Sequence, residues 1–149
     1  MKRYIEINGE ISFIIFESGG WEINVKIEPD DVIAFFMELQ LIEFYHANSI
    51  TIRSLKTGRN IIIVLQNEDN EINVELINDK FKITLTHDDI GYISSYLLQY
   101  YRDSSVSVNH IQFDVPNNSN IGTDGMFIIS ATVSLPPLSG EEAKKLLGI

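Results

Sequence analysis

The sequence predicts an α+β domain with a mainly antiparallel β-sheet and two principal helices. Many segments alternate apolar and polar residues, as half-buried strands do, whereas two segments repeat apolar residues every three or four positions, as amphipathic helices do. The links between consecutive strands are short and rich in Gly, Asn and Asp, which favours hairpins and therefore antiparallel neighbours. Because 149 residues suit one core, we expect residues 1–149 to form a single domain.

An internal repeat organises these elements. Sliding the chain against itself by 58 residues aligns a strand and the helix after it with a second strand and helix. The sequence thus predicts two ββαββ pseudo-repeats, at about residues 11–66 and 71–134. Because few matches are identities, a true duplication and two similar strand-to-helix junctions both remain open. The matched pairs are Ile23 with Phe81, Val25 with Ile83, Ile27 with Leu85, Val32 with Ile90, Phe35 with Ile93 and Leu39 with Leu97, and, farther upstream, Ile14 with Ile72 and Phe16 with Val74.

Each half is expected to contain two strands, a helix and two more strands. The run 61–65 is apolar at every position, which predicts a central strand buried on both faces, and we interpret the run 13–16 in the same way. Ser139 and Glu142 have capping-box spacing and predict a short C-terminal helix at about 139–147. The pattern leaves open whether the strands form one sheet or two sheets that meet between the repeats. The expected strands are 11–16, 21–27, 49–56, 60–66, 71–77, 80–86, 105–114 and 126–134, and the expected helices are 29–46 and 87–102.

Two pairs of adjacent aspartates, Asp30–Asp31 and Asp88–Asp89, each follow a strand and begin a helix. Glu28 and Thr86 occupy the capping positions before them, where carboxylates three residues later face unpaired amides and the positive end of the helix dipole. A divalent cation held by these carboxylates and His87 is the alternative. However, adjacent helical residues point about 100° apart and no His or Glu follows at i+3 or i+4. We therefore interpret the pairs as helix-capping residues and expect no metal and no cofactor.

The charge balance narrows the classes of function. Asp and Glu number 21 against 11 Lys and Arg, giving a formal charge of −10. Such a surface repels nucleic-acid phosphates and anionic membranes and attracts basic proteins. The chain has no cysteine and no recognisable catalytic motif, so we expect no enzymatic activity. Acidic residues interrupt the apolar stretch near the N-terminus, which argues against a signal peptide and favours a cytoplasmic protein.

A row of tyrosines on the second predicted helix is the main candidate for a contact surface. Tyr92, Tyr96 and Tyr100 are spaced i, i+4 and i+8, and tyrosine is a preferred interface residue. The alternative is that these rings pack beneath a loop or the C-terminal tail. The loop 114–125 is the other candidate, because it is long where the first repeat has a short turn. The expected partner-binding residues are Asp88, Tyr92, Tyr96, Asp103, Asn117, Asn118 and Asp124.

These features together favour a small acidic binding protein. The most specific expectation is an immunity protein that neutralises a cognate basic toxin, such as a bacterial nuclease, by protein–protein binding. One alternative is a phage-type inhibitor whose carboxylates mimic nucleic acid, although the acidic residues are scattered over most elements. The other is a homo-oligomeric structural or ligand-binding domain.

Overall fold

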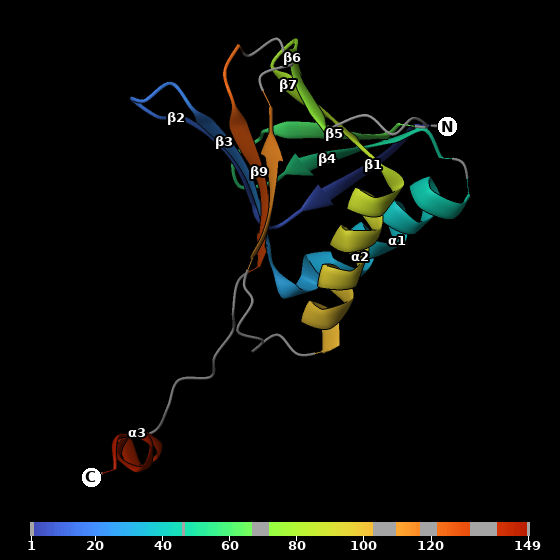
Figure 1. Cartoon of the computed structure of the whole chain (residues 1–149). Coiled ribbons are helices and arrows are strands. Elements are labelled where there is room, and N and C mark those ends of the chain that lie inside the picture. The colour runs from blue at the N-terminus through green and yellow to red at the C-terminus, as the bar shows by residue number, and fades with distance from the viewer. Residues whose placement is uncertain are drawn as a thin grey trace.

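The computed structural model describes residues 2–45, 47–66, 72–102, 110–116, 122–131 and 140–148, and within them the predicted α+β class is confirmed (Figure 1). The strands are β1 (Lys2–Ile7), β2 (Glu10–Ile15), β3 (Trp21–Ile27), β4 (Ser49–Ser54), β5 (Asn60–Leu65), β6 (Asn73–Ile77), β7 (Lys80–Leu85), β8 (His110–Val115) and β9 (Gly125–Ala131). The helices are α1 (Val32–Phe44), preceded by the 3-10 turn η1 (Pro29–Asp31), α2 (His87–Arg102) and α3 (Gly140–Leu147).

The strands form two mixed sheets. Sheet A has the order β1-β4-β5-β7-β6, and sheet B has the order β2-β3-β9-β8. The four consecutive hairpins are antiparallel; the links of the first three are short, as predicted from the sequence, and the fourth pair, β8 with β9, is joined by the long loop. Three parallel pairs, β1 with β4, β3 with β9 and β5 with β7, complete the sheets. The prediction of mainly antiparallel pairing is therefore confirmed, and the chain has two sheets where one was equally compatible with the sequence.

The pairing follows one rule in both halves of the chain. The first hairpin of the first half joins the last hairpin of the second half through β3 and β9. The second hairpin of the first half joins the first hairpin of the second half through β5 and β7. When each strand is replaced by its counterpart, the order β2-β3-β9-β8 becomes β6-β7-β5-β4, which is sheet A without β1. Each sheet thus needs a hairpin from both halves.

The core confirms most of the repeat-derived matches. Both members of all six strand and helix pairs, from Ile23 with Phe81 to Leu39 with Leu97, are buried. The upstream matches are wrong: Ile14 and Phe16 are exposed, although their supposed counterparts are buried. The turn between β2 and β3 is longer than the turn between β6 and β7, which shifts the register of the earlier strand.

The two apolar runs differ in their surroundings. β5 is the central strand of sheet A, as predicted, but only Ile61 and Ile63 are fully buried, while Ile62 and Val64 on the other face are partly exposed. The run 13–16 was predicted to be buried and is not. Because β2 lies at the edge of sheet B, Ile15 is 67% exposed. Apolar composition alone does not distinguish a central strand from an edge strand.

The two principal helices pack against each other on one side of the strands (Figure 1). Gln40 of α1 donates a hydrogen bond to Ser94 of α2 (3.3 Å), and α1 also contacts β1, β4 and β5 of sheet A. Phe13 of β2 and Phe81 of β7 are in ring contact at 4.7 Å, so the two sheets also contact each other directly. No helix in the described part of the chain is both long enough and apolar enough to cross a membrane.

Candidate functional site

The first aspartate pair is structural. The Asp31 carboxylate is buried and accepts three backbone N–H groups: Oδ1 from Asn8 (2.7 Å), and Oδ2 from Gly9 (3.0 Å) and Glu28 (2.9 Å). The bond from Glu28 is the predicted capping contact. The bonds from Asn8 and Gly9 were not predicted; they attach the turn between β1 and β2 to the start of the first helix. Asp30 beside it is exposed.

The second pair also caps its helix. The Thr86 N–H donates to Asp89 Oδ2 (3.1 Å), and the Asp89 N–H donates to Thr86 Oγ1 (3.2 Å), which completes a capping box. Asp88 is exposed. No group of three or more His, Cys, Asp or Glu side chains within the described segments is arranged to hold a metal ion.

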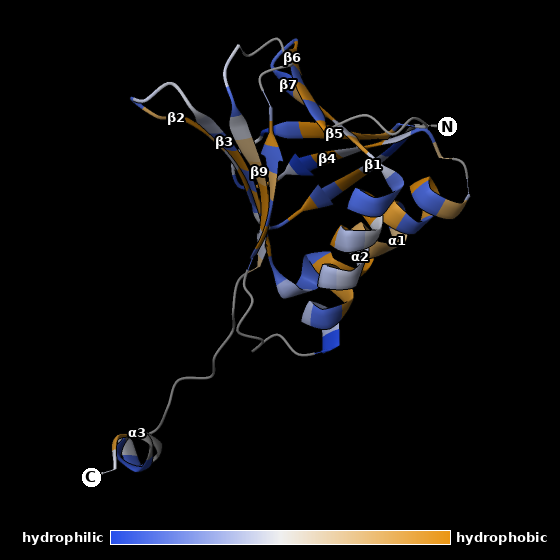
Figure 2. Cartoon of the chain, viewed as in Figure 1, coloured by the Kyte–Doolittle hydropathy of each residue, from blue (hydrophilic) through white to orange (hydrophobic). Residues whose placement is uncertain are grey.

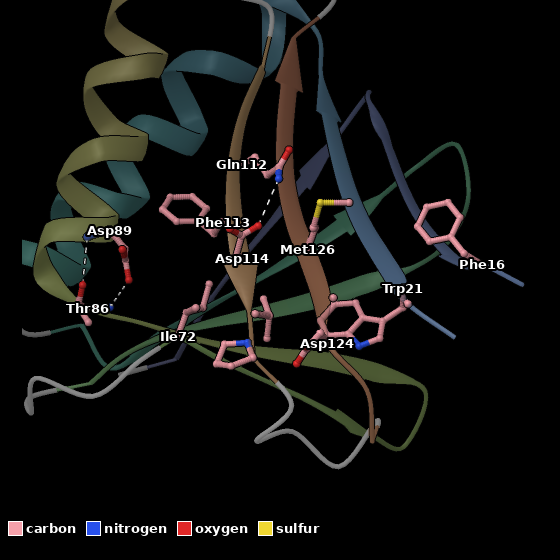
Figure 3. A pocket seen from close by; sticks show the side chains of 14 residues that line it. Phe16, Trp21, Ile72, Thr86, Asp89, Gln112, Phe113, Asp114, Asp124 and Met126 are labelled. Atoms are coloured by element: carbon pink, nitrogen blue, oxygen red, sulfur yellow. Dashed lines mark hydrogen bonds between the residues drawn. The ribbon is translucent and has the colours of Figure 1, made fainter. Parts of the chain in front are cut away.

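A cavity of about 910 Å³ opens beside Asp89. Figure 3 shows Thr86 and Asp89 at the start of α2 on one side, Trp21 and Phe16 on the other, and β8 and β9 between them. This volume falls in the range of pockets that hold ligands or the side chains of a partner protein. We call it the acidic pocket, because of the charges described below.

Aromatic rings give the acidic pocket rigid walls. Trp21 is buried, and its Nε1–H donates to the Thr123 carbonyl oxygen (2.8 Å), which fixes the indole against the end of β9. Phe113 of β8 packs on Phe127 of β9, with ring centroids 6.0 Å apart. Tyr92 of α2 meets the same Phe113 ring edge-on at 6.0 Å. The wall formed by Phe113 is therefore supported from both the sheet and the helix.

Three carboxylates give the pocket its charge. Asp89, Asp114 and Asp124 contribute to the lining, and no Lys, Arg or His is found among the described residues that line it. Asp114 accepts a hydrogen bond from the Gln112 side chain (3.3 Å), and both Asp114 and Asp124 are exposed. Carboxylates beside aromatic faces favour a cationic group, which can form ion pairs and cation–π contacts together.

The structure separates the predicted binding residues into three groups. Asp124 lines the acidic pocket, and Tyr92, 56% exposed, lies beside it through its contact with Phe113. Asp88 is on the surface of the first turn of α2. Tyr96 is only 5% exposed, so it belongs to the core and not to a contact surface. The remaining three, Asp103, Asn117 and Asn118, lie outside the described residues.

Sequence reasoning missed most of the pocket. Trp21 and Phe113 occupy inward positions of alternating strands, where an aromatic residue signals core packing. Asp89 was assigned only a capping role. The acidic end of β8, where Asp114 begins the long loop, was the one available signal.

Burial perturbs two of the tyrosines on α2. Burial, and then the neighbouring Tyr100, raises the pKa of Tyr96 to about 12. The Tyr96 hydroxyl is buried and has no hydrogen-bond partner among the residues that the structure describes. Burial also raises the pKa of Tyr100, with smaller contributions from the negative charges of Glu28 and Asp31. Tyr96 is therefore a neutral, unsatisfied group at neutral pH.

No protein-family model matches the chain, and no curated protein sequence matches it. The geometry and charge of the acidic pocket therefore carry the functional argument.

Proposed function

We propose that this chain is a small acidic binding protein that neutralises a basic partner protein in the cytoplasm, as an immunity protein neutralises its cognate bacterial toxin. The observation that carries the proposal is the acidic pocket, in which three carboxylates and three aromatic rings surround a cavity without a described cation. The function requires binding alone and no catalytic step.

The charge of the whole chain supports the same proposal. A formal charge of −10 accelerates the approach of a basic partner, an effect that weakens as salt screens the field. At the pocket, an Arg or Lys side chain of the partner would face Asp114 and Asp124 while it contacts the partly exposed ring of Phe113. Long-range attraction would thus set the association rate, and the pocket would set specificity.

A pulldown from a lysate of the source bacterium, at low and then high salt, tests the proposal. We expect a basic protein to bind at low salt and to dissociate at high salt. The variant Asp114→Asn/Asp124→Asn should weaken that capture at least ten-fold, because it removes two pocket charges. The control Glu6→Gln/Asp30→Asn removes the same charge at exposed positions outside the pocket. If both double variants weaken binding equally, only net charge matters and the pocket has no role.

A second candidate, self-association, is supported by α1. This helix is apolar around its circumference: Phe35 and Leu39 are buried in the core, yet Ile33, Met37 and Phe44 on the other side are 54–61% exposed. Figure 2 shows the orange of hydrophobic residues along this helix. An apolar helical face of this kind is typical of an interface. Light scattering at high protein concentration tests it: a dimer that Met37→Lys converts to a monomer supports self-association, and a monomeric wild type excludes it.

A further inference from the structure

β1 is the one described strand that breaks the correspondence between the two halves. It runs parallel to β4 at the edge of sheet A. The counterpart of β4 is β8, whose described pairing is to β9 alone, so it forms the edge of sheet B. The hairpin registers align Ile50 of β4 with Ile111 of β8 and therefore Ser54 with Val115. The position beside β8 is the one that β1 fills beside β4.

Several groups hold β1 in the first half. Asp31 accepts the N–H groups that follow the strand, as described above, and the Ser54 hydroxyl donates to the Gly9 carbonyl oxygen (2.7 Å). The Leu55 N–H donates to the Ile7 carbonyl oxygen (3.0 Å). At the other end of β1, Arg3 forms an ion pair with Glu38 on α1.

The counterparts of these groups surround the acidic pocket. The 58-residue shift places Asp89 at the position of Asp31, and both Asp89 and Val115 line the cavity. In the described segments the Asp89 carboxylate accepts only the capping N–H of Thr86. The same shift places Tyr96 at the position of Glu38, and its buried hydroxyl is one of two buried side-chain groups left without a partner among the described residues. The second half therefore retains the aspartate that holds the end of β1 but no described strand beside it, whereas Val115 lacks the hydroxyl of Ser54.

The two halves differ in what precedes their first hairpin, and no described strand of the second half fills this position. In the first half, β1 leads directly into β2. In the second half, the residues before β6 must connect it to the end of β5, between Leu65 and Asn73.

We propose that this position binds an extended, basic segment of the partner protein, which adds to sheet B parallel to β8 as β1 adds to sheet A. The assignment rests on the proposed role in protein binding and specifies how the partner is recognised. Edge strands present unpaired N–H and C=O groups that accept such a strand. The segment would bring its C-terminal end to Asp89, whose carboxylate can accept two backbone N–H groups as Asp31 accepts those of Asn8 on Oδ1 and Gly9 on Oδ2.

The first half also indicates which amides would pair. The Ser54 N–H points to the carbonyl oxygen of Arg59, on the β5 side, whereas the next N–H along the chain points to β1. Because N–H directions alternate along a strand, the N–H groups of Gln112 and Asp114 face the open side of β8. Pro116 follows the strand and has no N–H, so pairing would end at Asp114.

The charge of the bound segment follows from one cross-strand pair. Glu6 of β1 lies opposite Arg53 of β4. The counterpart of Arg53 on β8 is Asp114, so the charge at this place is reversed. Opposite charges stabilise cross-strand pairs, and we therefore expect Lys or Arg in the partner opposite Asp114.

A synthetic peptide tests the inference without the natural partner. The probe copies residues 2–9 with Glu6→Lys, with both ends blocked, and is titrated into isotope-labelled protein by NMR. We expect saturable shifts of the Gln112, Asp114 and Asp89 amide signals, and weaker binding of the peptide that keeps Glu6. Gln112→Pro should weaken binding at least ten-fold, since proline removes an outward N–H and edge strands tolerate it there. Gln112→Ala loses the same side chain but keeps the N–H, so it should bind the peptide at least ten-fold more tightly than Gln112→Pro does.

Two results would overturn the inference: no saturable shifts at β8 with millimolar peptide, or equal binding by the proline and alanine variants. The lysate pulldown separates it from the proposed function. If the basic partner is captured equally by Gln112→Pro, the binding role stands and strand addition is wrong. If the peptide binds β8 but no partner is captured, the strand position stands and the proposed function fails. A dimer that Gln112→Pro dissociates would show that a second copy occupies the position.

Discussion

Replacing Asp31 with asparagine should destabilise the protein far more than the same replacement at Asp89. The two residues occupy equivalent places in the repeat, and each accepts the capping N–H of its helix. Asp31 additionally accepts the N–H groups of Asn8 and Gly9 while buried from solvent. Comparing Asp31→Asn with Asp89→Asn therefore separates the contribution of helix capping from the contribution of the bonds that attach β1.

The size of the effect follows from the donors around Asp31. An asparagine can direct its carbonyl oxygen to Gly9 and Glu28, but its NH₂ group then faces the N–H of Asn8. One charge-assisted bond, worth about 1.5–3 kcal/mol, is lost. The two that remain become neutral and lose roughly half their strength. We expect Asp31→Asn to lower the free energy of unfolding by about 3–6 kcal/mol.

The control should lose much less. Asp89→Asn keeps an oxygen for the Thr86 N–H, but this bond becomes neutral and the interaction of the charge with the helix dipole is lost, which together cost about 1–2.5 kcal/mol. Urea unfolding at pH 7, followed by the fluorescence of the single buried tryptophan, measures both values. A difference below about 1 kcal/mol between the variants would refute the argument, because the bonds to the turn after β1 would then contribute nothing beyond capping.

Two further predictions concern buried groups. The pKa of Tyr96 is about 12 in the folded protein, whereas a free tyrosine has a pKa near 10, so the unfolded state ionises first as the pH rises. The wild type should therefore lose up to about 2.7 kcal/mol of stability between pH 10 and 12. Tyr96→Phe should lack this loss and be more stable by about 1 kcal/mol at pH 7, since it removes a buried hydroxyl without a described partner. Coincident stability curves for the two proteins would contradict both statements. Gly125→Ala should cost at least about 2 kcal/mol, because its Cβ would lie 2.1 Å from the Trp21 ring. The Cβ of Gly140→Ala would meet no atom of the described residues within 4 Å, so this variant should leave the melting temperature nearly unchanged.

Local pattern alone was enough to locate the regular elements. The alternation in β3 and β7 and the i, i+3, i+7 spacing in α1 and α2 correctly identified six buried pairs across the repeat. The capping boxes were equally visible, because a cap involves residues only three positions apart. Where turn length mattered, as between β2 and β3, the same pattern gave the wrong register.

Tertiary contacts decided what the pattern could not. Asp31 and Asp89 are indistinguishable in their local sequence, yet only Asp31 meets Asn8 and Gly9, because β1 lies beside it. Tyr92 and Tyr96 belong to one row of tyrosines, but the packing of α2 exposes the first and buries the second. The environment of a side chain depends on which elements pack over it, and the spacing within its own element does not contain that information.

The sequence by itself determined the α+β class, the hairpins, the two principal helices and their caps, since these depend on periodicity and turn chemistry within a few residues. Only the tertiary structure decided that β3 pairs with β9 and β5 with β7, that β8 is left at an edge, and that three carboxylates meet beside it. Strands far apart in the chain carry no local signal of their partners, because parallel pairing depends on how the hydrophobic faces of both halves are buried together.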